Sequence, residues 1–175
     1  LPIQLKSLSS MQTLDISYNA FSGRIDWLPK NLQNLDLFGN SFSGIVPAVY
    51  LPTKLSKIGL GSNYFKGALP LAKRAEYLYV QDNYFSGSFP ASYGTCTSLN
   101  YINISCNLFT GVFPNDVFNQ SIVLSLDIHE NSFTGTIPQR MSKSRELWQL
   151  NMEYNMLTGP IPTFFGVMSR LKEVI

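Results

Sequence analysis

The sequence predicts a repeat solenoid of the α/β type, a stack of short coils with one parallel β-sheet along its concave side. One observation is that a single pattern returns seven times along the 175 residues, with a period of 20 to 24 residues that is typical of stacked repeat coils. The other is that apolar residues alternate in the first part of each copy, as expected of a strand with one buried face.

The repeat is defined by a column of asparagines. Its members are Asn19, Asn40, Asn63, Asn83, Asn107, Asn131 and Asn155, spaced by 21, 23, 20, 24, 24 and 24 residues. The cleanest copy runs Leu32-x-x-Leu35-x-Leu37-x-x-Asn40-x-Phe42-x-Gly44-x-Val46-Pro47. Because the chain turns off the strand at the asparagine, we expect the amide to bond backbone groups that the turn leaves unpaired.

Three further columns follow the asparagines. Two residues on stand Phe21, Phe42, Phe65, Phe85, Phe109 and Phe133, with Leu157 in the last copy. Two residues later stand Gly23, Gly44, Gly67, Gly87, Gly111, Gly135 and Gly159, which suits a turn with positive φ. An apolar residue then precedes proline in six copies, and this favours a short second extended segment after the turn. We expect the phenylalanines to stack between coils.

The segments Asn40 to Pro47 and Asn155 to Pro162 resemble the plant-specific subclass of leucine-rich repeats. That subclass occurs in receptor-like kinases, receptor-like proteins and wall-enzyme inhibitors of plants, and similar repeats occur on protist surfaces. The resemblance spans nearly the whole chain and implies a leucine-rich-repeat arc that binds partners with its strand face. The copies of 20 and 21 residues depart from a strict 24-residue plant array and are more similar to protist or bacterial repeats.

We expect a single domain over residues 1–175, with seven full coils and partial coils at both ends. Leu1-Pro2 fits the end of an earlier coil, and Leu171 and Val174 fit the start of an eighth strand. Solenoids need capping units at their ends. The sequence therefore predicts a fragment of a longer chain, or neighbouring subunits that cover both ends.

The composition excludes several classes of protein. A content of 45% hydrophobic and 14% charged residues is that of a folded domain. No run of about 18 apolar residues is present, so no membrane insertion or signal peptide is predicted within this segment. The net charge of +2 and the scattered basic residues argue against a nucleic-acid partner.

Charge is segregated on the predicted strand face. It carries seven of the eleven acids but only Lys57 of the thirteen basic residues; the acids are Asp15, Asp36, Glu76, Asp82, Asp127, Glu130 and Glu153. This predicts a basic partner. Asp15, Asp36 and Asp127 share one strand position, so a structural role is an equal alternative for them, and the other four are the better binding candidates.

Aromatic residues accompany these acids on the same face. The predicted partner-binding residues are Glu76, Tyr77, Tyr79, Asp82, Tyr101, His129, Glu130, Trp148, Glu153 and Tyr154. Exposed aromatic residues beside charge are enriched in protein interfaces. Cross-strand stacking among the tyrosines is the alternative explanation.

Catalysis, cofactors and metals are not predicted. Cys96 and Cys106 are expected to be free thiols, because they form no disulfide framework and no zinc pattern of closely spaced ligands. An enzyme would have to use His129, the one histidine, with Asp127, Glu130 or Glu153. An open solenoid face offers neither a water-excluding pocket nor a nucleophile with an oxyanion site, so a surface histidine is the preferred interpretation.

Two sequons, Asn119-Gln-Ser121 and Asn103-Ile-Ser105, match the N-glycosylation acceptor, and Asn119 is the better candidate because it lies off the strand face. The sequence thus predicts a non-catalytic module, extracellular or at the cell surface, that binds a protein or peptide. The alternative is a structural scaffold subunit of a larger assembly.

Overall fold

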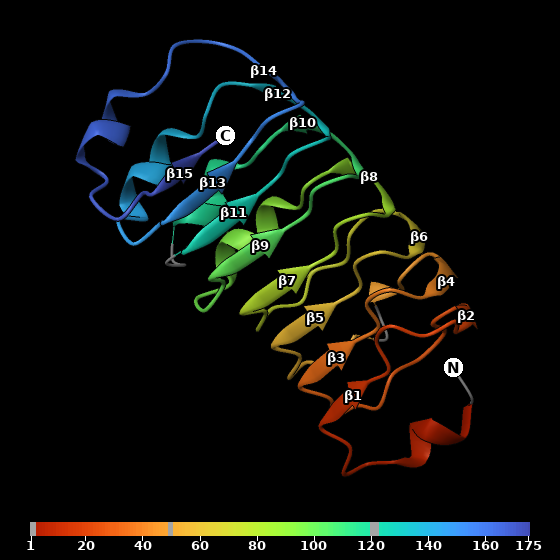
Figure 1. Cartoon of the computed structure of the whole chain (residues 1–175). Helices are drawn as coiled ribbons and strands as arrows, with labels where there is room; N and C mark the ends of the chain where they lie inside the picture. Colours follow the sequence, from red (N-terminus) through yellow and green to blue (C-terminus); the bar gives the residue numbers. More distant parts are fainter. Residues whose placement is uncertain (1–2, 49–50, 120–122) are drawn as a thin grey trace.

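A computed structural model describes residues 3–48, 51–119 and 123–175 of the chain. The coils stack in sequence order, and the two ends of the chain lie at opposite ends of the stack (Figure 1). Each coil contributes one strand to each of two parallel sheets. The predicted solenoid is therefore confirmed.

The first sheet contains the odd-numbered strands, in sequence order, and every pairing within it is parallel. These strands are β1 (Thr13–Asp15), β3 (Asn34–Asp36), β5 (Lys57–Gly59), β7 (Tyr77–Tyr79), β9 (Tyr101–Asn103), β11 (Ser125–Asp127), β13 (Gln149–Asn151) and β15 (Glu173–Val174). The middle residue of each three-residue strand is buried and its neighbours face solvent, as alternation predicts, except that Gly59 of β5 is also buried. We call this solvent side of the first sheet the strand face.

The second sheet was predicted only as an extended segment following the turn. Its strands are β2 (Ser22–Gly23), β4 (Ser41–Gly44), β6 (Tyr64–Gly67), β8 (Tyr84–Ser88), β10 (Leu108–Val112), β12 (Ser132–Gly135) and β14 (Met156–Leu157). The strands β4, β6, β8, β10 and β12 cover the phenylalanine and the glycine of their coils, whereas β2 begins after Phe21 and β14 ends before Gly159. These five strands end two or three residues before the proline of their coil. Proline has no N–H to donate and lies outside the ladder.

Short 3-10 helices cover the outer side of the coils. They are η1 (Ile3–Ser7), η3 (Ala91–Thr95), η4 (Asn115–Phe118), η5 (Gln139–Lys143) and η6 (Thr163–Val167). Pro90, Pro114, Pro138 and Pro162 immediately precede the last four, because a fixed φ suits the start of a helix. The α/β-type arc thus has 3-10 turns as its helical part within the described residues.

A stack of phenylalanines forms the centre of the core. Phe42, Phe65, Phe85, Phe109 and Phe133 are buried, and consecutive rings lie 6.1 to 6.5 Å apart and nearly parallel. Phe21 at the first coil is 48% exposed. The predicted aromatic column is confirmed, and its burial depends on having a coil on each side.

The asparagine column forms the predicted ladder. The Asn63 Oδ1 accepts the N–H of Phe42 in the preceding coil at 2.9 Å, and the Asn63 Nδ2 donates to the carbonyls of Leu37 and Leu60. The same bonds recur at Asn40, Asn83, Asn107, Asn131 and Asn155. Each amide therefore joins two coils at the edge of the core.

Candidate functional site

The predicted partner-binding residues all lie on or beside the strand face. Tyr77 and Tyr79 belong to β7 and Tyr101 to β9, and all three are half-buried. Asp82, Glu130, Glu153, Trp148 and Tyr154 are exposed. The face therefore displays acidic and aromatic side chains over neighbouring coils.

The acids at the shared strand position have structural partners. Asp15, Asp36 and Asp127 each accept the backbone N–H two residues on, at 3.0 to 3.2 Å. Asn103 and Asn151 occupy the same position and make the same bond. Hydrogen bonds from Ser17 lower the pKa of the Asp15 carboxyl. This column ties the strand end to the following turn, which agrees with the structural alternative.

Lys57 is bound to one of these acids. Its Nζ lies 2.8 Å from the Asp36 Oδ2, and this hydrogen bond raises the pKa of the Lys57 ammonium. A hollow on the strand face is lined by Asp36, Lys57, Tyr79 and Gln81, among others. The paired lysine therefore leaves the rest of the face with its acidic character.

The tyrosines stack across strands. The rings of Tyr77 and Tyr101 lie 5.0 Å apart at an interplanar angle of 5°, and Tyr79 lies 6.2 Å from Tyr77. Hydrogen bonding to Glu76 raises the pKa of the Tyr77 phenol. The predicted stacking alternative is thus present, and it gives the face a rigid aromatic platform with polar tips.

A left-handed residue precedes the asparagine in each coil. This column comprises Tyr18, Gly39, Ser62, Asp82, Cys106, Glu130 and Tyr154, with φ between 49° and 64°. Positive φ is uncommon for residues other than glycine and re-aims the side chain. The asparagine pattern carries no signal for this backbone conformation, so Asp82, Cys106 and Glu130 could not be grouped from the sequence.

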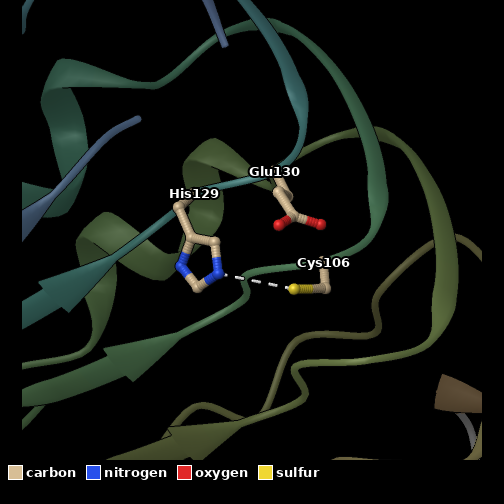
Figure 2. A group of neighbouring side chains, drawn as sticks. All are labelled: Cys106, His129 and Glu130. Carbon is tan, nitrogen blue, oxygen red and sulfur yellow. Dashed lines mark hydrogen bonds between the residues drawn. The ribbon is translucent and has the colours of Figure 1, made fainter. Parts of the chain in front are cut away.

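Cys106 and His129 meet through this column. The Cys106 Sγ lies 3.4 Å from the His129 Nε2 (Figure 2). The His129 Nδ1 lies 2.6 Å from the Asp127 Oδ1. Because an ionised carboxylate only accepts hydrogen bonds, the Nδ1 is assigned as the donor and the Nε2 keeps its lone pair. The Asn151 amide lies 3.3 Å from the same Nδ1.

The Cys106 thiol contacts the His129 imidazole, which in turn contacts the Asp127 carboxylate. Enzymes with a nucleophilic cysteine use the same order of groups. The chemistry differs, because burial and the nearby carboxylates of Asp82 and Glu130 raise the pKa of the Cys106 thiol to about 12. Nucleophilic cysteines have lowered pKa values. The neutral thiol therefore argues against nucleophilic catalysis by Cys106.

The expectation that metal ligands lie close together in the sequence does not apply to a solenoid. Here residues on neighbouring coils are close in space but one coil period apart in the sequence.

The predicted glycosylation sites have different surroundings. Asn119 is exposed and its amide donates to the Asp116 carboxylate, while Gln120 and Ser121 of its sequon lie outside the described residues. Asn103 is half-buried on β9 and accepts bonds from Ser105.

Cys96 is buried and Cys106 half-buried, both as free thiols. No helix within the described ranges is long and apolar enough to cross a bilayer.

Comparison with known families and sequences identifies relatives. The family described as Leucine Rich Repeat matches residues 31–50 and 98–120. Receptor-like protein 54 of Arabidopsis thaliana is 30% identical over 95 residues, which are 51% of this chain and 12% of that protein. Receptor-like protein 7 is 35% identical over 96 residues, again 51% of this chain and 10% of that protein. The chain thus spans about a tenth of the length of these relatives.

Solved structures share the fold over almost the whole chain. The Arabidopsis receptor kinase HAESA, in complex with the peptide hormone IDA and the co-receptor SERK1, matches with a TM-score of 0.83 and 25% identity, over 98% of this chain and 34% of that one. The plant peptide hormone receptor RGFR1, in complex with RGF2, matches with a TM-score of 0.79 and 25% identity, over 98% of this chain and 33% of that one. A plant ice-binding protein matches with a TM-score of 0.63 and 22% identity, over 93% of this chain and 70% of that one. At this identity the match indicates a shared fold and nothing more.

Proposed function

The chain is a leucine-rich-repeat protein of the plant type, and from that premise we propose that it is a non-catalytic recognition module that binds a peptide or protein on its strand face. Two of the structures it is similar to are peptide receptors in complex with their ligands. We place the module outside the cell or at its surface, which the sequons and the receptor-like relatives support.

The observation that carries the proposal is the distribution of acids that have no basic partner. None of the ion pairs among the described residues includes Glu76, Asp82, Glu130 or Glu153. Glu76 and Asp82 lie on the coil of Asn83, and Glu130 and Glu153 lie on the coils of Asn131 and Asn155. Acids that are not neutralised by a basic side chain and are gathered on one face attract basic ligands and raise their association rate. A basic peptide or a basic protein segment is therefore the proposed partner.

The size of the face suits an extended peptide. Strands about 4.8 Å apart give eight strands a span of about 34 Å, and an extended chain rises about 3.3 Å per residue. A peptide of about ten residues crosses the whole sheet. The acids lie towards its middle and its C-terminal coils, so basic residues near the corresponding part of the peptide would meet them.

Aromatic side chains supply the apolar part of the interaction. Trp148 and Tyr154 are exposed beside Glu153, and Tyr154 is 73% exposed. The stacked pair of Tyr77 and Tyr101 stands next to Glu76. Aromatic anchors surrounded by polar groups are the usual hot spots of interfaces. These residues are proposed as the contacts that set affinity, and the acids as those that set partner choice.

Selection from a peptide display library tests the proposal. The wild-type protein serves as bait, beside a triple variant with Glu76→Gln, Asp82→Asn and Glu153→Gln. A matched triple variant changes Asp26→Asn, Asp116→Asn and Glu146→Gln, three acids off the strand face. Glu130 stays unchanged because of its contacts with Cys106 and His129.

The expected outcome is enrichment of peptides rich in lysine and arginine by the wild-type protein and by the control variant. The strand-face variant should lose them, because only it has lost the charge that faces the ligand. Enrichment that is equal with all three baits, or of acidic peptides, would refute the assignment of the face.

A further inference from the structure

Three potential metal ligands from two consecutive coils converge at one edge of the strand face. Cys106 precedes the Asn107 of its coil, and His129 and Glu130 precede Asn131 of the next. Cys106 and Glu130 share a left-handed φ of 49°. One ligand atom from each of the three residues lies within 4.8 Å of the others (Figure 2). Equivalent backbone conformations on adjacent coils bring these side chains together.

We propose that Cys106, His129 and Glu130 bind a single Zn²⁺ ion. A thiolate sulfur, an imidazole nitrogen and a carboxylate oxygen are the ligands that zinc takes in proteins. Calcium and magnesium prefer all-oxygen sites, so they do not suit the sulfur and nitrogen. The site extends the chemistry of the chain beyond peptide recognition and does not depend on it.

The distances favour a zinc site. With zinc bonds of about 2.3 Å to sulfur and about 2.0 Å to nitrogen, a tetrahedral site separates these two atoms by about 3.5 Å. The Cys106 Sγ and the His129 Nε2 lie 3.4 Å apart. Glu130 is exposed and its side chain is free to close the remaining distance by rotation. Two ligands therefore already stand at the spacing that the ion requires.

His129 is oriented for metal binding by a second residue. Its Nδ1 donates to the Asp127 carboxylate at 2.6 Å, which leaves the Nε2 lone pair directed at Cys106. Metal-binding histidines commonly donate their other N–H to a carboxylate, which fixes the ring and increases its basicity. Asp127 also accepts the backbone N–H of His129, so the turn itself holds this pair. Asp127 acts here as a positioning residue.

The cluster leaves room for a fourth ligand. Glu130 is exposed, so the site is reached from solvent. On the preceding coil Asp82 occupies the position equivalent to Cys106 and lines a hollow together with it. A water molecule or a group from a bound partner can therefore complete the tetrahedron.

A divalent cation also matches the charge of the site. The cluster holds the Glu130 carboxylate beside one thiol and one imidazole, and Asp127 adds a second carboxylate through His129. A coordinating thiol is deprotonated, so the two positive charges of Zn²⁺ offset the negative charge of these ligands.

Cobalt and zinc titrations test the site. The whole chain, freed of any affinity tag and treated with chelator, is titrated with Co²⁺ while the near-ultraviolet thiolate-to-cobalt absorption is followed, and with Zn²⁺ by calorimetry. The variants are Cys106→Ser, His129→Gln and Asp127→Asn, and the matched control is Cys96→Ala, which removes the other thiol. Circular dichroism of the metal-free proteins compares their folds.

We expect one equivalent of Zn²⁺ and a cobalt-thiolate band in the wild-type protein and in Cys96→Ala. Cys106→Ser should lose the band, and His129→Gln should weaken zinc affinity at least about tenfold. Asp127→Asn should keep the band and weaken affinity by roughly 10–100-fold. The proposal fails if the wild-type protein binds no stoichiometric metal. It fails equally if Cys106→Ser and His129→Gln bind Zn²⁺ as tightly as the wild type, or if the band depends on Cys96.

Discussion

The Oδ1 of Asn107 accepts the backbone N–H of Phe85, one coil earlier, at 2.9 Å. The amide of Asn107 also donates to the carbonyls of Val80, Ile104 and Ser105 at 2.9 to 3.2 Å. One buried side chain thus satisfies backbone groups of two coils where both turn away from the first sheet. This relationship, repeated along the stack, fixes the turn that presents Cys106 to the strand face.

Replacing Asn107 by alanine should destabilise the protein by about 2–5 kcal/mol, because a buried donor and buried carbonyls lose their partners. Asn19 is exposed and donates only within its own coil, so Asn19→Ala should cost about 0.5 kcal/mol. Urea unfolding of the two variants measures the difference. Equal losses would show that the ladder between coils is not what stabilises the stack.

Phe109 tests the aromatic column in the same way. Phe109→Ala should cost about 3–5 kcal/mol, because the side chain is fully buried between Phe85 and Phe133. Phe21→Ala should cost far less, since Phe21 is 48% exposed. Hydrogen exchange of the Phe109→Ala variant should show the earliest opening in the coils next to residue 109. A uniform loss of protection along the chain would contradict stability that depends on neighbouring coils.

Two glycines at equivalent positions of η3 and η6 differ in their surroundings. A Cβ at Gly94 would clash with the backbone oxygen of Asp116 in the next coil, whereas a Cβ at Gly166 would meet nothing within 4 Å. Gly94→Ala should therefore cost about 1–3 kcal/mol, and Gly166→Ala should leave stability unchanged within about 0.5 kcal/mol. Thermal unfolding of both variants distinguishes a packing clash from a general effect of losing glycine.

The periodic part of the structure could be predicted from the sequence. The asparagine, phenylalanine and glycine columns have one physical role each, so the same residue type recurs, and the ladder, the ring stack and the positive φ of Gly23 to Gly159 follow. The position before the asparagine has a common backbone conformation but varied residues. The convergence of Cys106 with His129 and Glu130 therefore left no periodic signal, and it became visible only with the coils in place.

The second sheet shows a similar limit. The bias of residues before proline predicts an extended segment, but the strands of the second sheet run over Phe85 and Gly87 and end before Phe89 and Pro90. Backbone bonds between coils, such as the N–H of Ser41 to the carbonyl of Phe21, decide where these strands lie. Such bonds depend on the stacking of coils and not on local sequence preference.

Tyr93 should make stability depend on alkaline pH. Its hydroxyl donates to the Pro70 carbonyl at 2.9 Å, and complete burial raises the pKa of the phenol well above its usual value. The neutral phenol is favoured in the folded state, so its contribution is fully present below pH about 10 and is lost as pH rises further.

Urea unfolding at several pH values from about 8 to about 11 measures this dependence. Tyr93→Phe should be somewhat less stable near pH 8, because the Pro70 carbonyl loses its donor. Above pH about 10 the free energy of unfolding of Tyr93→Phe should fall less steeply with pH than that of the wild type. The two slopes should differ by up to ~1.4 kcal/mol per pH unit. An unchanged slope would show that Tyr93 does not govern the alkaline transition.

The recognition role is tested most directly by the salt dependence of affinity for a basic peptide enriched on the wild-type protein. Calorimetry between about 50 and 300 mM salt compares the wild type with the Glu76→Gln, Asp82→Asn, Glu153→Gln variant and with the control at Asp26, Asp116 and Glu146. We predict affinity that falls with salt in the wild type and in the control, and weak, nearly salt-independent binding in the strand-face variant. Equal affinity and equal salt dependence in all three proteins would contradict recognition through the acidic strand face.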